Sequence, residues 1–107
     1  MNYNQVKRKE LSKLISKAER KAGLEPGAIC SRNQRLKKRI GDIHVSELRR
    51  ALVFVAKQDQ QITYEEIAKQ IGFKRHSTVI ITYRNAQNFY KQGDDKFYKA
   101  LNLVVKN

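Results

Sequence analysis

Residues 63–79 read TYEEIAKQIGFKRHSTV, and this stretch predicts a short helix, a tight turn and the start of a longer helix. Thr63 and Glu66 have the T-x-x-E spacing of a capping box, in which each side chain satisfies an exposed backbone N–H group at a helix start. The apolar residues behind this box recur at helical spacing and are Tyr64, Ile67, Ala68 and Ile71. Gly72 then predicts the end of the helix, because glycine readily adopts the left-handed conformation that terminates one.

A longer helix is predicted from about 76 to 91, ending at Gly93, with Val79, Tyr83, Ala86 and Tyr90 buried. Together the two helices have the arrangement of a helix-turn-helix, at about 63–91. In that motif the N-terminal residues of the second helix touch base edges in the major groove. The corresponding side chains here can all donate hydrogen bonds, and they are Lys74, Arg75, His76, Ser77 and Thr78. The pattern alone also fits an ordinary helical hairpin with a polar turn.

The remainder of the chain also has helical periodicity. A first helix over 4–22 is expected to bury Leu11, Leu14, Ile15, Ala18 and Ala22 and to stop at Gly23. A short helix from Pro26 to Cys30 and a basic loop over 31–45 follow. Ser46 is expected to cap a central helix, with Leu48, Ala51, Leu52 and Val55 inward, and Asp94 or Asp95 to cap a last one. The class is therefore all-α, a five- or six-helix bundle in one domain, residues 1–107.

The charge of the chain points to a polyanionic partner. The 107 residues include 23 Lys plus Arg against 10 Asp plus Glu, a formal net charge of +13. A surplus of this size fits DNA, RNA, ribosome assembly or an acidic protein surface. The longest apolar run, Ala51 to Ala56, is far shorter than the ~20 residues of a membrane helix, so no membrane partner is expected. One cysteine, Cys30, which is expected to be buried, and two histidines make a poor metal inventory, so no metal and no cofactor is predicted.

The residues around the predicted turn resemble a known family. Residues 72–79, GFKRHSTV, align without a gap with Gly-Gly-Arg-Asp-His-Thr-Thr-Val, the signature of the C-terminal DNA-binding domain of the bacterial replication initiator DnaA. The resemblance continues upstream to about Ser46 and covers Leu11 to Arg39 more loosely. It implies a Trp-repressor-like helical fold and double-stranded DNA as the partner. Phe73 stands where the signature has its second glycine, and the initiator's ATPase module has no counterpart here, so a stand-alone module is expected.

The resemblance also implies roles for single residues. His76 and Ser77 fall on positions that touch thymine methyl groups in the major groove. Thr78 and Lys57 fall on phosphate contacts. Lys74 keeps the positive charge of the signature arginine and is grouped with these phosphate contacts.

Two departures from the family pattern change the expected DNA sequence. Arg75 replaces an aspartate that reads a cytosine amino group. Since arginine has donors and no acceptor, it suits guanine O6 and N7, or alternatively a phosphate. The family's minor-groove arginine falls on Gly41, so that role could pass to the basic loop at Lys37, Lys38 or Arg39, or be lost.

The function predicted is sequence-specific binding of double-stranded DNA, as an accessory replication factor or a transcriptional regulator, in the cytoplasm at the nucleoid. Two alternatives stay open. One is a basic RNA- or ribosome-binding protein, and the other is an adaptor that occupies initiator sites or binds the initiator itself, with a replication or ATPase protein as its partner. His76 with Glu66 or Cys30 could form a catalytic pair, but no third orienting group supports it. No enzymatic activity and no small-molecule substrate are therefore expected.

Overall fold

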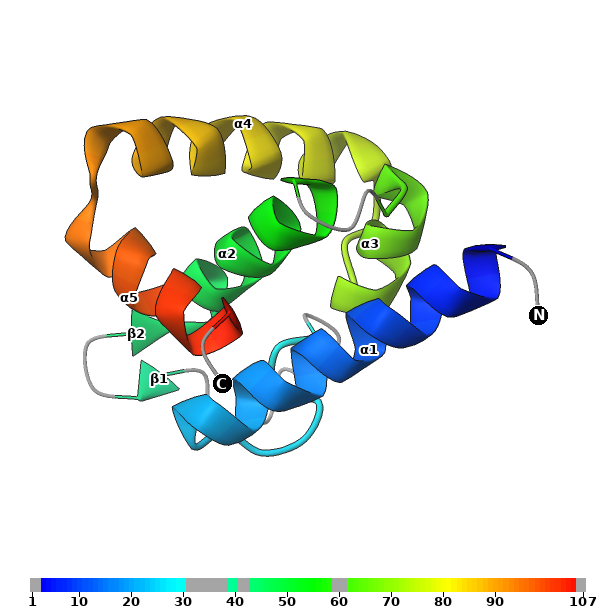
Figure 1. The fold of residues 1–107 in the computed structure, drawn as a ribbon, viewed down its shortest axis with the longest axis horizontal. Helices are drawn as coiled ribbons and strands as arrows, with labels where there is room; N and C mark the ends of the chain where they lie inside the picture. The colour runs from blue at the N-terminus through cyan, green and yellow to red at the C-terminus, as the bar shows by residue number, and fades with distance from the viewer. Residues whose placement is uncertain (1–2, 31–38, 41–42, 59–61, 106–107) are drawn as a thin grey trace.

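The computed structural model describes residues 3–30, 39–40, 43–58 and 62–105, which form five helices and one very short ladder (Figure 1). The helices are α1 (Tyr3–Ala22), α2 (Val45–Gln58), α3 (Tyr64–Ile71), α4 (His76–Gln92) and α5 (Asp95–Val105). Strands β1 (Arg39–Ile40) and β2 (Ile43–His44) pair antiparallel directly before α2. The predicted all-α class is confirmed, and the short ladder is a feature that the sequence pattern did not predict.

Helix α2 lies at the centre of the molecule and packs against each of the other four helices. In Figure 1, α4 runs along one edge above α2, while α5 and α1 lie on its other side. The buried residues of α2 are Val45, Leu48, Ala51, Leu52, Val53, Val55 and Ala56. All four predicted inward positions are among them. Full burial of one Val or Leu side chain stabilises a fold by about 1.5–3 kcal/mol. The buried side chains of α2 are therefore a major source of the stability of the core.

Two of the predicted helix starts are confirmed. At the start of α3, the Thr63 hydroxyl accepts a hydrogen bond from the Glu66 N–H group at 3.2 Å. At the start of α5, the Asp94 carboxylate accepts from the Phe97 N–H group at 2.9 Å. These bonds satisfy donors that the first turn of a helix otherwise leaves without a partner.

The predicted cap of α2 is wrong, because His44 takes the place expected for Ser46. The His44 Nδ1 atom accepts from the Ser46 N–H group at 3.0 Å, and the Glu47 carboxylate accepts from the His44 N–H group at 3.3 Å. This reciprocal pair is a capping box with a histidine in the first position. The helix consequently begins at Val45, two residues earlier than a Ser46 cap allows.

The predicted short helix over 26–30 is also wrong. Instead the segment makes two turns, in which Ala28 N–H donates to the Glu25 carbonyl and Cys30 N–H to the Gly27 carbonyl. Gly27 has a φ of +88°, which a right-handed helix does not tolerate. Cys30 is half-buried rather than buried.

One long side of α4 packs on the core while the other faces solvent. Val79 and Ala86 are buried, as predicted, and Tyr83 is half-buried. Tyr90, also predicted inward, is 46% exposed. It lies near the end of α4, where its ring stacks on the Phe54 ring with the two ring centres 5.1 Å apart.

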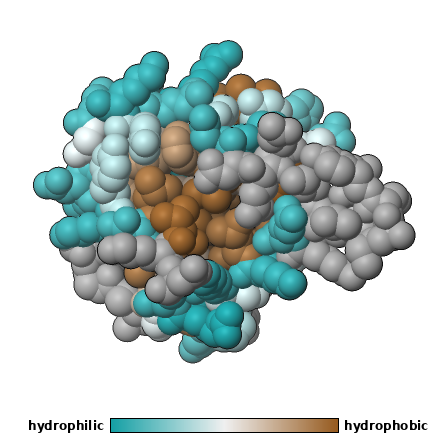
Figure 2. Space-filling model, viewed as in Figure 1, coloured by the Kyte–Doolittle hydropathy of each residue, from teal (hydrophilic) through white to brown (hydrophobic). Residues whose placement is uncertain are grey.

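An apolar patch occupies the middle of the face shown in Figure 2. It coincides with a hollow between α1, α2 and α5 that is lined by Leu14, Val55, Val104 and Val105, with Glu10, Lys13 and Lys17 around it. Within the described part of the chain, no helix combines the length and apolar character needed to cross a membrane.

Candidate nucleic-acid interface

The turn between α3 and α4 is built on Gly72, which has a φ of +92°. The Gly72 and Phe73 N–H groups both donate to the Ala68 carbonyl, at 2.8 and 2.9 Å. This is the pattern in which glycine takes the left-handed position and the next residue returns to ordinary backbone. Phe73 occupies that next position and its half-buried ring packs against the core. A large side chain is therefore accommodated in this turn.

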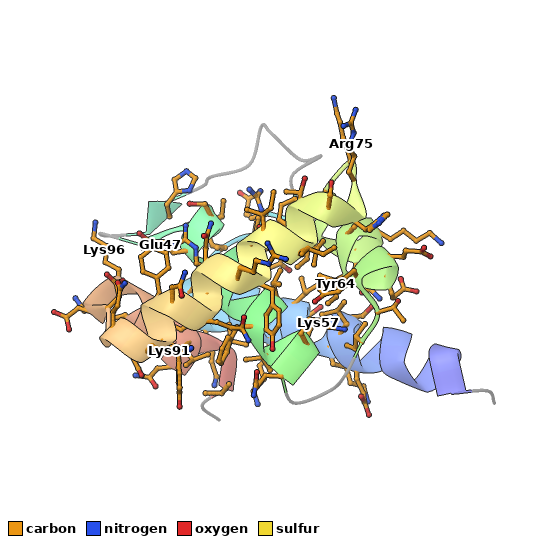
Figure 3. The ribbon with its side chains drawn as sticks, turned by 90° about the horizontal axis from the view of Figure 1, so that it is seen from above. Glu47, Lys57, Tyr64, Arg75, Lys91 and Lys96 are labelled. Carbon is orange, nitrogen blue, oxygen red and sulfur yellow. The ribbon has the colours of Figure 1, made fainter. Side chains whose placement is uncertain are left out.

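Five consecutive residues after this turn are all exposed, and they are Lys74, Arg75, His76, Ser77 and Thr78. The structure thus brings together all the predicted site residues of this stretch at one end of α4. Figure 3 looks onto the outer side of α4 and shows Arg75 projecting away from the body of the molecule. Arg75 has extended backbone, with φ −133° and ψ 143°, and is the last residue before the helix.

The start of α4 differs from those of α2, α3 and α5 because no side chain caps it. Arg75 stands at the N-cap position, and a guanidinium has no acceptor with which to bind the N–H groups of the first turn. Those N–H groups and the helix dipole favour a negatively charged group from outside. The exposed side chains around these N–H groups, residues 74–78, are themselves hydrogen-bond donors.

The electrostatic surroundings of α4 also favour an anion. From residue 67 to residue 93 the sequence contains no acidic residue and five basic ones, Lys69, Lys74, Arg75, Arg84 and Lys91. The acids that precede this stretch, Glu65 and Glu66, lie in the first turn of α3. All of α4 therefore has only neutral or positive side chains.

The solvent side of α4 carries three further exposed residues that the sequence analysis did not single out, Ile81, Arg84 and Asn88. We call these three together with Ser77 the outer stripe, and all four side chains are exposed. At about 100° per residue they lie within about 60° of one another around the helix, nearly opposite the buried Val79. The exposure of Ile81 could have been predicted from its angular position around the helix, because Ile81 and Val79 lie on opposite sides and cannot both face the core.

Lys57 lies apart from these residues, at the end of α2. Its Nζ atom donates to the Ile62 carbonyl oxygen at 3.0 Å and lies 4.3 Å from the centre of the Tyr64 ring (Figure 3). Lys57 therefore connects the end of α2 to Ile62 and Tyr64 at the start of α3. An ammonium has three donors, so this bond leaves capacity for the phosphate contact, which stays a prediction.

The predicted minor-groove loop is only partly within the described residues. Lys37 and Lys38 lie outside them. Arg39 is in β1, where its backbone pairs opposite His44. The ladder thus brings the end of the basic loop next to the start of α2.

A second hollow lies between α1, α3 and the turns over 26–30, and the Ser12 hydroxyl in its lining donates to the Gln70 side-chain oxygen at 2.8 Å. The buried Glu19 carboxylate accepts from the Ile29 N–H group at 3.1 Å. The Ile29 carbonyl in turn accepts from Arg49 Nε, and burial lowers the pKa of the Arg49 guanidinium. Among the described residues, no group of three or more His, Cys, Asp or Glu side chains could hold a metal ion.

The start of α4 thus offers an anionic ligand several donors, positive charge and an uncapped helix end in one place. No family model matches the chain, and no curated protein or solved structure matches it either.

Proposed function

We propose that the chain binds double-stranded DNA sequence-specifically, with α3, residues 72–75 and α4 acting as a helix-turn-helix. The observation that carries this proposal is the run of five exposed donor side chains, residues 74–78, at the uncapped start of a helix. A helix-turn-helix uses that end of its second helix to reach base edges in the major groove. The absence of acidic residues from 67 to 93 removes repulsion from the phosphates on both sides of the groove.

The length of α4 supports this docking. Its 17 residues span about 25 Å, whereas the major groove is about 12 Å wide. The first two or three turns can therefore lie in the groove while the end of the helix stays on the protein core. In this pose Arg75, His76 and Ser77 face base edges.

Phosphate contacts are assigned to the residues at the sides of this helix start. Lys74 and Thr78 flank the base-facing residues, and Lys57 approaches the backbone from the end of α2. Such contacts set the register of the protein on the duplex and carry no sequence information. The basic loop with Lys37, Lys38 and Arg39 enters the adjacent minor groove in this proposal.

The resemblance of residues 72–79 to the DnaA C-terminal domain supports the same assignment. The main departure in the turn, Phe73, follows the left-handed glycine and is compatible with the motif. A module of this kind serves as an accessory replication factor or a transcriptional regulator at the nucleoid. It needs no cofactor for binding.

Competition between random duplex DNA and structured RNA tests the proposal, with the full chain and labelled duplex over a range of salt concentrations. Non-specific phosphate binding falls steeply with salt, while specific binding leaves a sequence-dependent affinity. We expect some duplexes to stay bound at salt concentrations that release both random duplex and RNA. RNA that competes better than every duplex would overturn the proposal in favour of an RNA- or ribosome-binding protein.

A further inference from the structure

Ile81 is the most exposed of the large hydrophobic side chains among the described residues, at 59%. The other two are Tyr90 and Val105, at 46% and 47%. Tyr90 stacks on neighbouring rings, and Val105 lines the apolar hollow near the end of α5. Ile81 instead stands on the outer stripe between Ser77 and Arg84, one helical turn from the proposed base-contacting residues.

Single exposed isoleucines are common on protein surfaces, so exposure alone indicates nothing. Two further observations concern this position. It lies on the side of α4 that carries Ser77, within about 40° of it around the helix. It also lies in the stretch without acidic residues, where a duplex can approach closely. The apolar group that a major groove presents on its base edges is the 5-methyl group of thymine, so this is the group that the Ile81 side chain would contact.

We propose that Ile81 contacts a thymine 5-methyl group and so determines one base of the preferred sequence. This inference rests on the proposed function and adds a residue to its recognition surface. Four residues along a helix correspond to about 6 Å, or fewer than two base-pair steps. The thymine read by Ile81 lies within two base pairs of the base read by Ser77.

The contact is tested by removing the methyl group and the isoleucine separately and together. The probe is a duplex selected by the full chain, in which each thymine is replaced in turn by deoxyuridine. For the wild-type chain we expect about a fourfold loss of affinity at the thymine next to Ile81, the effect of one buried methyl group. Ile81→Ala should abolish the loss at that thymine, because no partner for the methyl group remains.

Val105→Ala is the matched control, since it shortens an exposed aliphatic side chain away from α4 and should keep the wild-type sensitivity. Ile81→Ala should fold normally, because the position is exposed and alanine favours helices. The inference is overturned if Ile81→Ala retains the full loss at every thymine, or if no thymine of a specifically bound duplex is sensitive. Both of these results leave specific DNA binding intact. A wild-type chain that selects no duplex overturns the proposed function and the inference together.

Discussion

Arg75 is the residue whose replacement should most change the preferred DNA sequence. Its side chain is exposed and makes no capping bond at the start of α4. Surface substitutions of this kind change the free energy of unfolding by less than about 0.5 kcal/mol. Arg75→Ala should therefore leave the fold intact, so that changes in DNA binding can be assigned to the lost guanidinium.

The expected effect on binding is a loss of discrimination at one base pair. A bidentate contact between an arginine and guanine O6 and N7 contributes ~1–3 kcal/mol of discrimination, or about 5- to 150-fold in relative affinity. We expect the wild-type chain to prefer guanine at one position by such a factor. Arg75→Ala should bind all four bases there equally while it keeps its preferences elsewhere. The assay is titration of the selected duplex and its three single-pair variants with each chain.

Two companion variants sharpen this test. Arg75→Asp should move the preference at the same position towards cytosine, since a carboxylate accepts from the cytosine amino group. Thr78→Ala, at the same helix start, should weaken binding to all four duplexes alike because its contact is with a phosphate. If Arg75→Ala also weakens all four alike and relaxes no position, the guanidinium binds a phosphate and the base-reading role is wrong.

Substitutions at three other sites test separate predictions. Lys57→Ala should reduce the slope of log affinity against log salt concentration by about 0.9, and Lys57→Arg should restore that slope. An unchanged slope with an altered sequence preference would show that Lys57 does not contact a phosphate. The same Lys57→Ala change should lower the free energy of unfolding by about 1 kcal/mol in denaturant titrations, because the bond to the Ile62 carbonyl is lost. Replacing Lys37, Lys38 and Arg39 together with Ala should lower affinity and erase a preference for A·T pairs beside the site; survival of that preference would show that the loop stays out of the minor groove. Asp94→Ala should cost about 1 kcal/mol of stability through loss of the α5 cap, with a smaller cost expected for Asp95→Ala, and equal costs would show that the cap contributes little.

Helix positions in this chain could be predicted because periodicity and end signals agree. The glycines at 23, 72 and 93 all have positive φ at the ends of α1, α3 and α4, as their places in the sequence indicated. Thr63 and Asp94 cap as predicted. The cap of α2 was predicted wrongly because two residues compete for that position. Ser46 is a better N-cap than histidine by preference, but His44 accepts from the Ser46 N–H group and Glu47 completes the box.

The candidate site could be predicted in part. The exposure of residues 74–78 follows from their polarity and from the turn at Gly72. The function of Lys57 in holding the Ile62 carbonyl could not be predicted, because it depends on how the end of α2 meets the segment before α3. Ile81 was missed because an isoleucine in a helical apolar pattern is usually assigned to the core, and only the position of Val79 on the buried side excludes this.

Selection of bound duplexes from a random pool measures directly whether the chain binds DNA sequence-specifically. The full chain is incubated with the pool at physiological salt, and the recovered duplexes are sequenced over successive rounds. We predict that the pool converges on one short sequence, bound at least about 10³-fold more tightly than random duplex. A pool that remains random after repeated rounds, with an affinity that depends only on salt, would contradict sequence-specific DNA binding by this chain.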